Sequence, residues 1–342
     1  MTTEAFVLTK YGNAEDAFQL KTVDLPALKS NEVLIDSEGF GLNYADVMAR
    51  RNMYKEAPAL PAVLGYEVVG KVIQIGSECD TTLLGKRVLA FTRFGAYAKH
   101  VVTIVTGVLE IGDLESHIAL ALCTQGVTAY YMASYISQIR PMDKVLVHAA
   151  AGGVGSLLVQ MAKNNGAIVI AKVGTAEKVD VVLDLGADFA INYKTENYEE
   201  RLLSILRGDC LDISFNAVAG STVKKDLSLL GPGGRLFLFG GAEMVSGKFG
   251  IFSKLNFVRK MMMFLPIGLM MRSKSIIGVN MLKIADVKPE IIATCLKEVY
   301  QLYLQGKLHP LLGKQFKQDS MQEAHAFLES GTSQGKVSVI WD

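Results

Sequence analysis

Short apolar runs alternate with amphipathic segments along the middle of the chain. From Lys144 onward, almost continuously apolar runs are followed by stretches in which apolar residues recur at helical spacing. The predicted strands are 145–148, 167–173, 190–192, 213–216 and 235–240, and the predicted helices are 155–164, 176–185, 198–206 and 221–230. Strands that are apolar on both faces are typical of a parallel sheet covered on both sides by helices. The alternation therefore predicts an α/β protein with a doubly wound sheet, which 275–279 is expected to complete.

The first third of the chain has a different pattern, with short strands separated by turns. Runs rich in β-forming residues cover 5–8, 32–38 and 67–75, and glycines and prolines interrupt the sequence around them. This pattern predicts a partly open β-barrel. After Ser116 the pattern changes, and 118–137 has the length and the small apolar residues of a single helix. A helix, a short helical segment and a last strand are expected at 288–305, 324–328 and 337–341.

The composition is that of a folded protein with more than one domain. At 342 residues the chain exceeds the size that one hydrophobic core usually supports. Half of the residues are apolar and a fifth are charged, which argues against disorder. The net charge is +1 and no basic block is present in the sequence, so nucleic acid is not an expected partner.

A glycine-rich turn follows the first strand of the predicted sheet. His148 ends that strand and is expected to shape the turn, which reads Ala-Ala-Ala-Gly-Gly-Val-Gly and leads into a helix. In the register A-x-x-G-x-x-G, Ala149 takes the tight turn, Gly152 lets backbone N–H groups approach a pyrophosphate, and Gly155 lets the helix pack closely. The helix N-terminus adds partial positive charge. The predicted cofactor-binding residues of this turn are Ala149, Gly152, Gly153, Val154 and Gly155.

The end of the second strand lacks the acidic residue of an NAD site. Such a site carries Asp or Glu about 20 residues beyond the glycine turn, where it holds the ribose hydroxyls. This chain has Lys172-Val-Gly-Thr175 there and Lys178 one helical turn later. Hydroxyl and ammonium donors suit a 2′-phosphate, so the sequence favours NADPH. Glu177 falls inside the following helix and could face solvent, and Lys178 could also lie on a solvated face.

The cysteines and the chain start indicate a cytoplasmic protein. The four cysteines stand far apart, without a Cys-x-x-Cys pair, and are expected to be reduced thiols. Residues 1–10 lack the layout of a signal peptide. The apolar run 261–271 is shorter than the roughly 18 residues that span a bilayer, and Pro266 and Gly268 interrupt it. It is expected to be buried or to cover a pocket, with peripheral membrane contact as the alternative.

Four segments carry a recognisable family pattern. They read NYADVMARRNMY (43–54), LPAVLGYEVVGKV (60–72), GKRVLAF (85–91) and GVTAYYM (126–132). They resemble the zinc-free medium-chain dehydrogenases/reductases of the quinone oxidoreductase group, and the resemblance covers essentially the whole chain. Within this group the chain is most similar to the synaptic-vesicle membrane protein VAT-1 family, through a long insertion at 245–274 and the run SIIGVNML (275–282).

The resemblance implies a domain arrangement and a homodimer. A GroES-like, partly open β-barrel catalytic domain is expected from 1–121 and 283–342, and a Rossmann domain from 122–282. The homodimer is expected to form through the cofactor domains. The insertion 245–274 is expected to lie over the cleft and cap an apolar acceptor pocket, and a dimer contact is the alternative.

The resemblance also assigns roles to residues at both ends of the cofactor. VGTAEK (173–178) and Ile191-Asn-Tyr193 match the segment that grips the 2′-phosphate of NADPH in those enzymes. The residues implied there are Gly174, Thr175, Lys178 and Tyr193, and Gly240 of the Phe239-Gly-Gly241 turn is expected at the cofactor as well.

Three further residues are expected near the reacting atoms. The resemblance places Asn43 beside the nicotinamide, where its amide could donate to the substrate oxygen or to the ribose. Tyr54 is expected either as a hydroxyl donor to the substrate or as a buried aromatic with a satisfied hydroxyl. Thr128 is expected to contact the nicotinamide, and Asp46 to brace the loop.

The residue types argue against zinc. Zinc-dependent relatives carry Cys where this chain has Asn43 and His where it has Tyr66, and neither replacement is a zinc ligand. The cysteine cluster of the structural zinc lobe is also missing from the sequence. Glu67 persists but cannot hold a metal alone, so no metal site is expected.

Without a Lewis acid, the acceptor must already be electrophilic. The expected function is transfer of hydride from NADPH to a small apolar quinone or α,β-unsaturated carbonyl. Two alternatives stay open: an NADPH-binding regulatory or membrane-associated adaptor with little turnover, and an enoyl-thioester reductase.

Overall fold

The computed structural model describes residues 1–243 and 266–342, which fold as two units. Unit 1 comprises Met1–Thr128, Met281–Gln305 and Pro310–Asp342, and unit 2 comprises Ala129–Asn280 and Gly306–His309. The chain passes from unit 1 to unit 2 between residues 128 and 129, and back to unit 1 between residues 280 and 281. The boundaries predicted from the sequence are 121/122 and 282/283. Gly306–His309 is held to unit 2 because Gln160 Nε2 donates to the His309 carbonyl oxygen at 2.9 Å.

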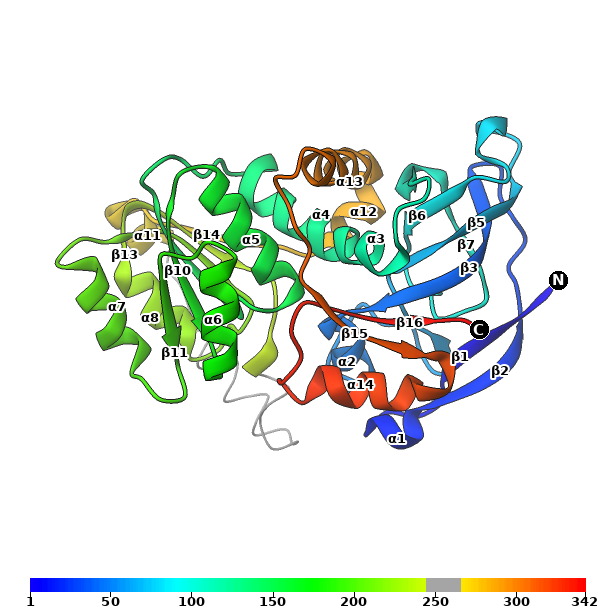
Figure 1. Cartoon of the computed structure of the whole chain (residues 1–342), viewed down its shortest axis with the longest axis horizontal. Coiled ribbons are helices and arrows are strands. Elements are labelled where there is room, and N and C mark those ends of the chain that lie inside the picture. The colour runs from blue at the N-terminus through cyan, green and yellow to red at the C-terminus, as the bar shows by residue number, and fades with distance from the viewer. Residues whose placement is uncertain (244–265) are drawn as a thin grey trace. The chain divides into compact units, whose positions relative to one another are not determined.

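Unit 2 is built on a six-stranded parallel sheet (Figure 1). Its strands in spatial order are β11 (Phe189–Asn192), β10 (Ile168–Val173), β9 (Lys144–His148), β12 (Leu211–Asn216), β13 (Leu230–Leu238) and β14 (Ser275–Gly278). In chain order this is 3-2-1-4-5-6, the order of dinucleotide-binding sheets. The predicted doubly wound parallel sheet is confirmed.

Helices cover this sheet because its strands are apolar on both faces. The connecting helices are α5 (Gly153–Asn164), α6 (Ala176–Asp184), α7 (Tyr198–Leu206) and α8 (Thr222–Leu229). Leu146 joins a buried cluster with residues of α7 and α8. Since successive strand residues point to opposite faces, Val145 and Val147 face the other side, and both are fully buried. Helix α11 (Pro266–Arg272) precedes β14 and buries none of its residues, and the rest of the predicted insertion, 245–265, lies outside the described residues.

Unit 1 contains a seven-stranded sheet and a smaller three-stranded sheet. The strands of the larger sheet are β3 (Glu32–Leu42), β5 (Glu67–Ile75), β6 (Arg87–Phe91), β7 (His100–Ile104), β8 (Val108–Glu110), β15 (Leu312–Lys317) and β16 (Lys336–Ile340). Strand β3 is the centre: β5 pairs along one edge, and β7 and β16 share the other. The smaller sheet has the order β2-β1-β4, with β1 (Thr2–Leu8), β2 (Phe18–Asp24) and β4 (Ala62–Val63).

The helices of unit 1 lie between and after these strands. They are α1 (Ala14–Ala17), α2 (Tyr44–Arg50), α3 (Ser116–Leu122), α4 (Thr124–Tyr130), α12 (Met281–Val287), α13 (Pro289–Leu304) and α14 (Met321–Glu329). Of these, α4 crosses the division between the units.

The helix predicted at 118–137 is wrong as a single element. The structure breaks it at Cys123, where ψ is −108°, and a π-helical turn covers Tyr131–Tyr135. The break has a polar cause, because the backbone N–H of Thr124 donates to Glu67 Oε2 at 2.8 Å. A helical run across Cys123 would direct that N–H to a carbonyl of the preceding turn.

Two further expectations, on the cysteines and on membrane-spanning helices, can be compared with the described residues. All four cysteines are free thiols. Among the helices of the described ranges, none combines the length and apolarity needed to cross a bilayer.

Candidate functional site

The glycine-rich turn joins β9 to α5 at the carboxyl edge of the parallel sheet. Ala149 adopts a left-handed φ of +50°, and Gly152 is the N-cap of α5. The helix begins at Gly153, two residues before the predicted start, and Ser156 N makes the first helical bond, to Gly152 O at 2.8 Å. The backbone N–H groups ahead of that bond belong to Gly153, Val154 and Gly155. Such N–H groups at a helix start are free to bind phosphate oxygens.

Close backbone packing requires glycine at position 155. A Cβ atom there would lie 2.3 Å from Ala149 O and 2.8 Å from Ala150 Cα. At Gly152 a Cβ atom would lie 3.1 Å from Ala149 O. The turn can therefore keep α5 against the strand only with glycine at 155, while Gly152 avoids a tight contact, in agreement with the A-x-x-G-x-x-G register.

The residues predicted for the 2′-phosphate come together at the adjoining strand ends. Tyr193 N donates to Val173 O at 3.0 Å, which places the ends of β10 and β11 side by side. A Cβ atom on Gly174 would lie 2.9 Å from the Tyr193 hydroxyl oxygen, so the ring lies directly over this glycine. Thr175 caps α6, because its Oγ1 accepts from Lys178 N at 3.4 Å.

Two other predicted features of this edge can be placed. Glu177 is exposed on α6, as its helical position suggested. Gly240 follows β13, and a Cβ atom there would lie 2.5 Å from Ala217 O, so it packs against the backbone that follows β12.

In unit 1, Asn43 belongs to a buried polar cluster with Glu67 and Lys336. Asn43 Nδ2 donates to Glu67 Oε1 at 2.8 Å, and Lys336 Nζ donates to Asn43 Oδ1 at 3.3 Å. Lys336 also forms an ion pair with Glu67, and neither side chain is exposed. An ammonium only donates and a carboxylate only accepts, so the cluster fixes the orientation of the Asn43 amide.

Sequence reasoning missed Lys336 as a member of this cluster. The signal in the sequence is weak: one lysine at the start of a last strand that is otherwise apolar except for Ser338. The glycine at position 41 is a second trace of the cluster in the sequence. In the structure a Cβ atom there would lie 2.2 Å from Glu67 Oε1 and 2.4 Å from Lys336 Cε. Gly41 therefore leaves the room that the ion pair occupies.

Asp46 holds the backbone around Asn43. Its Oδ2 accepts from Asn43 N at 2.9 Å, and its Oδ1 accepts from Gly65 N at 3.1 Å. Burial raises the pKa of Asp46 to about 7, although the two backbone bonds act in the opposite direction. This geometry agrees with a bracing role.

Thr128 is connected to Asn43 through shared partners. The Thr128 hydroxyl donates to Thr124 O at 2.6 Å, while Thr124 N donates to Glu67 Oε2. Its donor is thus used inside α4, and only its lone pairs stay available for a ligand. Tyr54 is half-buried, and burial raises its pKa to about 12, so the hydroxyl keeps its proton at neutral pH.

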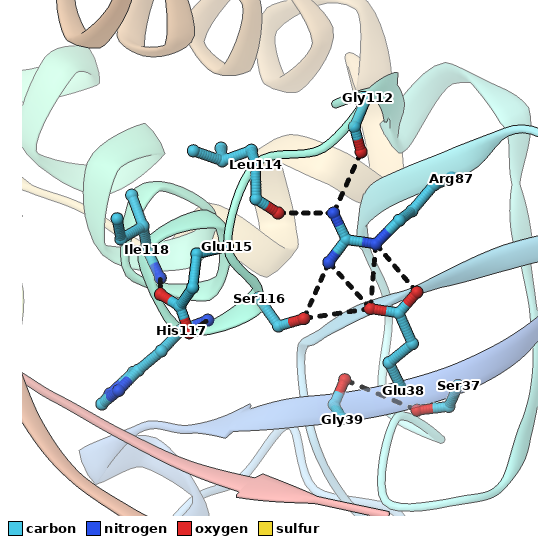
Figure 2. A network of polar contacts seen from close by, with 10 residues as sticks. All are labelled: Ser37, Glu38, Gly39, Arg87, Gly112, Leu114, Glu115, Ser116, His117 and Ile118. Atoms are coloured by element: carbon cyan, nitrogen blue, oxygen red, sulfur yellow. Dashed lines mark hydrogen bonds and ion pairs between the residues drawn. The ribbon is translucent and has the colours of Figure 1, made fainter.

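A hollow of about 460 Å³ beside Arg87 is a rival location for a ligand. Figure 2 shows that the Arg87 guanidinium is surrounded by its own chain. It donates to Glu38 through Nε and Nη2 at 2.8 Å each, to Gly112 O at 3.0 Å and to Ser116 Oγ at 2.8 Å. The donors are used internally, so this cluster fastens β6 to the start of α3 and has a structural role.

Comparison with known proteins agrees with both units. Sequence profiles match the alcohol dehydrogenase GroES-like domain at residues 29–139 and the zinc-binding dehydrogenase family at 153–297. A probable quinone oxidoreductase of Schizosaccharomyces pombe is 30% identical over 94% of this chain and 92% of its own length. The chain belongs to the medium-chain dehydrogenase/reductase family.

Within this family the chain belongs to the quinone oxidoreductase and VAT-1-like group of enzymes. The synaptic vesicle membrane protein VAT-1 homolog of Danio rerio is 30% identical over 98% of this chain and 69% of its own length. The structure of Escherichia coli quinone oxidoreductase complexed with NADPH superposes with a TM-score of 0.83 at 28% identity, covering 99% of this chain and all of that one. The predicted GroES-like and Rossmann folds are confirmed.

The side chains around Asn43 can be compared with the ligands that a zinc site requires. At the site where Asn43 and Tyr66 were predicted to replace ligands, the Glu67 carboxylate already binds Lys336 and Asn43. In the described ranges no group of three or more His, Cys, Asp or Glu side chains is placed to hold a metal ion. The Asn43 cluster therefore offers an amide and an ammonium where a metal would need further anionic or imidazole ligands.

Proposed function

We propose that this medium-chain dehydrogenase/reductase is an NADPH-dependent reductase that transfers hydride to a small apolar quinone or α,β-unsaturated carbonyl without zinc. The observation that carries the proposal is the Asn43–Glu67–Lys336 cluster. It neutralises Glu67 with a lysine and leaves an oriented amide as the polar group. An amide donor suits acceptors that need stabilisation of a developing oxyanion but no Lewis acid.

Residues of unit 2 support NADPH as the cofactor. The N–H groups of Gly153, Val154 and Gly155 suit the pyrophosphate, and Ala149 and Gly152 shape that turn. At the strand ends, Thr175, Lys178 and Tyr193 carry hydroxyl and ammonium donors that suit a 2′-phosphate, and Gly174 leaves room for the Tyr193 ring. The relative from Escherichia coli was solved with NADPH. Asn43, Thr128 and Gly240 complete the proposed cofactor contacts.

Residues of this chain stabilise the negative charge that forms on the acceptor oxygen, and solvent provides the proton. Bound NADPH supplies a hydride, which reduces the conjugated acceptor and leaves negative charge on its oxygen. Asn43 Nδ2 uses one hydrogen for Glu67 and has a second for that oxygen. The Tyr54 hydroxyl, protonated because its pKa is raised to about 12, is a second donor. Solvent supplies the proton that completes the hydroquinone or the saturated carbonyl.

The decisive experiment measures NADPH consumption by the purified protein with a panel of acceptors. We expect oxidation with para-benzoquinone, phenanthrenequinone or a long-chain 2-enal, and the same rate after dialysis against a chelator. Quenching of NADPH fluorescence without oxidation by any acceptor would support the adaptor alternative. Fastest turnover with crotonyl-CoA would support the enoyl-thioester alternative.

Exposed apolar residues of unit 2 favour a partner surface, and we infer that it is a homodimer contact. Met270 and Met271 of α11 are 73% and 81% exposed, and β14 is the end strand of the six-stranded sheet. A strand edge that no described strand pairs with, together with exposed apolar side chains, suits pairing with a second copy. Light scattering is expected to give twice the chain mass. A monomer that co-sediments with anionic liposomes would instead support membrane contact through 261–271.

A further inference from the structure

Lys172 is a buried lysine at the carboxyl end of β10. It is 5% exposed, and within the described part of the chain no carboxylate lies at ion-pair distance from its ammonium. Its Nζ lies 3.8 Å from the centroid of the Tyr198 ring and 5.1 Å from that of Tyr193. Buried lysines normally carry a direct anionic partner, so a cation held by two aromatic rings needs an explanation.

The nearest polar partner of Lys172 is a histidine that leads to an anion. Lys172 Nζ lies 3.5 Å from His148 Nδ1, and His148 Nε2 lies 2.9 Å from Asp226 Oδ2. A neutral imidazole with its hydrogen on Nε2 satisfies both neighbours, because the ammonium donates and the carboxylate accepts. Burial lowers the pKa of His148, which keeps the ring neutral.

Asp226 has enough other donors to be stable without Lys172. Ser214 Oγ donates to its Oδ2 at 2.8 Å, and Asn216 Nδ2 donates to the same oxygen at 2.6 Å. The imidazole of His148 therefore separates the Lys172 ammonium from the Asp226 carboxylate, and the two charges do not form a direct ion pair. The positive charge of Lys172 can act on a ligand at the strand ends.

Tyr193 links this buried charge to the surface. Its ring is half exposed and lies over Gly174, so that its hydroxyl is at the end of β10. A cation about 5 Å from the centre of a phenol ring attracts the ring and holds it in place. In Rossmann sheets this strand end faces the 2′ position of the adenosine ribose, where NAD enzymes place an acid.

We propose that Lys172 determines the preference for a 2′-phosphorylated dinucleotide, by positioning Tyr193 and by supplying a buried positive charge to the 2′-phosphate. The inference rests on the proposed NADPH dependence and adds the residue that decides between the two cofactors. A charge in a low-dielectric setting is weakly screened, so it discriminates between a dianionic phosphate and a neutral hydroxyl without direct contact.

The inference has a pH signature. Burial lowers the pKa of Lys172 to about 8, with Asp226 acting to raise it. The groups that face Lys172 from the surrounding elements are His148, Tyr193, Tyr198, Lys225, Asp226 and Glu243. The charged form favours phosphate, so affinity for NADPH falls as pH rises through and above this pKa, while affinity for NADH stays level. A bound phosphate stabilises the ammonium and moves the midpoint upward.

The test compares affinities of NADPH and NADH for the full-length protein, with 2′,5′-ADP and 5′-AMP as fragment probes. Lys172→Met keeps the apolar stem and removes the charge. We expect its affinity for NADPH and 2′,5′-ADP to fall about tenfold or more, and that for NADH and 5′-AMP to change less than about twofold. Lys163→Met is the matched control, since Lys163 pairs with Asp188 on the surface of the same unit. It is expected to keep the wild-type ratio.

The outcomes separate the inference from the cofactor proposal. Equal losses of both cofactors in Lys172→Met, or an unchanged ratio, would overturn the role of Lys172. A wild-type protein that prefers NADH would overturn the proposed cofactor itself. If Lys172→Met does not fold, Lys172→Arg decides: a charge that does not titrate should keep the NADPH preference and abolish its decline at high pH. Persistence of that decline would refute the assignment.

Discussion

Lys336 and Glu67 form an ion pair across 269 residues of sequence, and neither side chain is exposed to solvent. Lys336 begins β16 and Glu67 begins β5, and both strands pair with β3. The pair therefore exists only when the last strand of the chain has joined the sheet. It also holds the amide of Asn43, so the folding of unit 1 and the geometry of the candidate site depend on the same contact.

Removing the lysine alone is expected to destabilise the protein strongly. Lys336→Met leaves the Glu67 carboxylate buried without a cation, which costs about 3–5 kcal/mol. In Lys336→Met with Glu67→Gln both charges are gone, and most of that loss should be recovered. Urea unfolding of the three proteins measures the effect. Equal stabilities of the single and double variants would show that the pair is not a coupled unit.

Removing the Asn43 amide is expected to reduce turnover more than cofactor binding. Loss of one donor to a developing oxyanion lowers kcat by about a hundredfold. Asn43→Ala should therefore lose more in kcat than in affinity for NADPH. Asn31→Ala is the control, because Asn31 is an exposed residue of the same unit. An unchanged kcat in a folded Asn43→Ala protein would remove Asn43 from the mechanism.

Asp46 is expected to make stability depend on pH. Burial raises its folded-state pKa to about 7, above the value of about 4 in an unfolded chain. Between these two values the folded state binds more protons, so the stability of wild type relative to Asp46→Asn should fall by up to about 1.4 kcal/mol per pH unit and level off above pH 7. Denaturant unfolding from about pH 4 to pH 8 measures this. Asp24→Asn, at an exposed site, is the control for the replacement of a carboxylate by an amide. A flat difference for Asp46→Asn would contradict the raised pKa.

A methyl group at Gly155 is expected to abolish cofactor binding. The Cβ atom would lie 2.3 Å from Ala149 O, so α5 and the turn must separate. Fluorescence titration of Gly155→Ala should give at least about a hundredfold weaker NADPH binding. Gly268→Ala is the matched control, because a Cβ atom there has no described neighbour within 4 Å. Normal affinity in Gly155→Ala would rule out this turn as the pyrophosphate site.

Much of unit 2 could be predicted from the sequence because its strands and helices are local patterns. The helix Tyr198–Leu206 and the strand Glu67–Ile75 of unit 1 have the predicted bounds. The strand Leu312–Lys317 was missed, because its polar residues show no apolar period and only its pairing with β16 makes it a strand. The break at Cys123 was missed for a similar reason, since its cause is the distant Glu67.

In the candidate site, too, features within one segment could be predicted from the sequence, whereas contacts between distant segments could not. The glycine turn and the absence of an acid after β10 are visible in single segments of sequence. Lys336 is not visible in this way, because its role depends on the groups that the sheet brings beside it. The sequence shows Lys172 only as one of several donors at the strand end, and its burial against Tyr198 and His148 is known only from the structure.

Hydride transfer can be tested most directly with NADPH that carries deuterium at both positions of C4 of the nicotinamide and a long-chain 2-enal as acceptor. The account predicts a primary isotope effect on single-turnover NADPH oxidation, and deuterium retained on the β-carbon of the saturated product, in protein treated with a chelator. Bound NADPH that is not consumed, or a product without deuterium, would contradict the proposal that this chain is a metal-independent reductase.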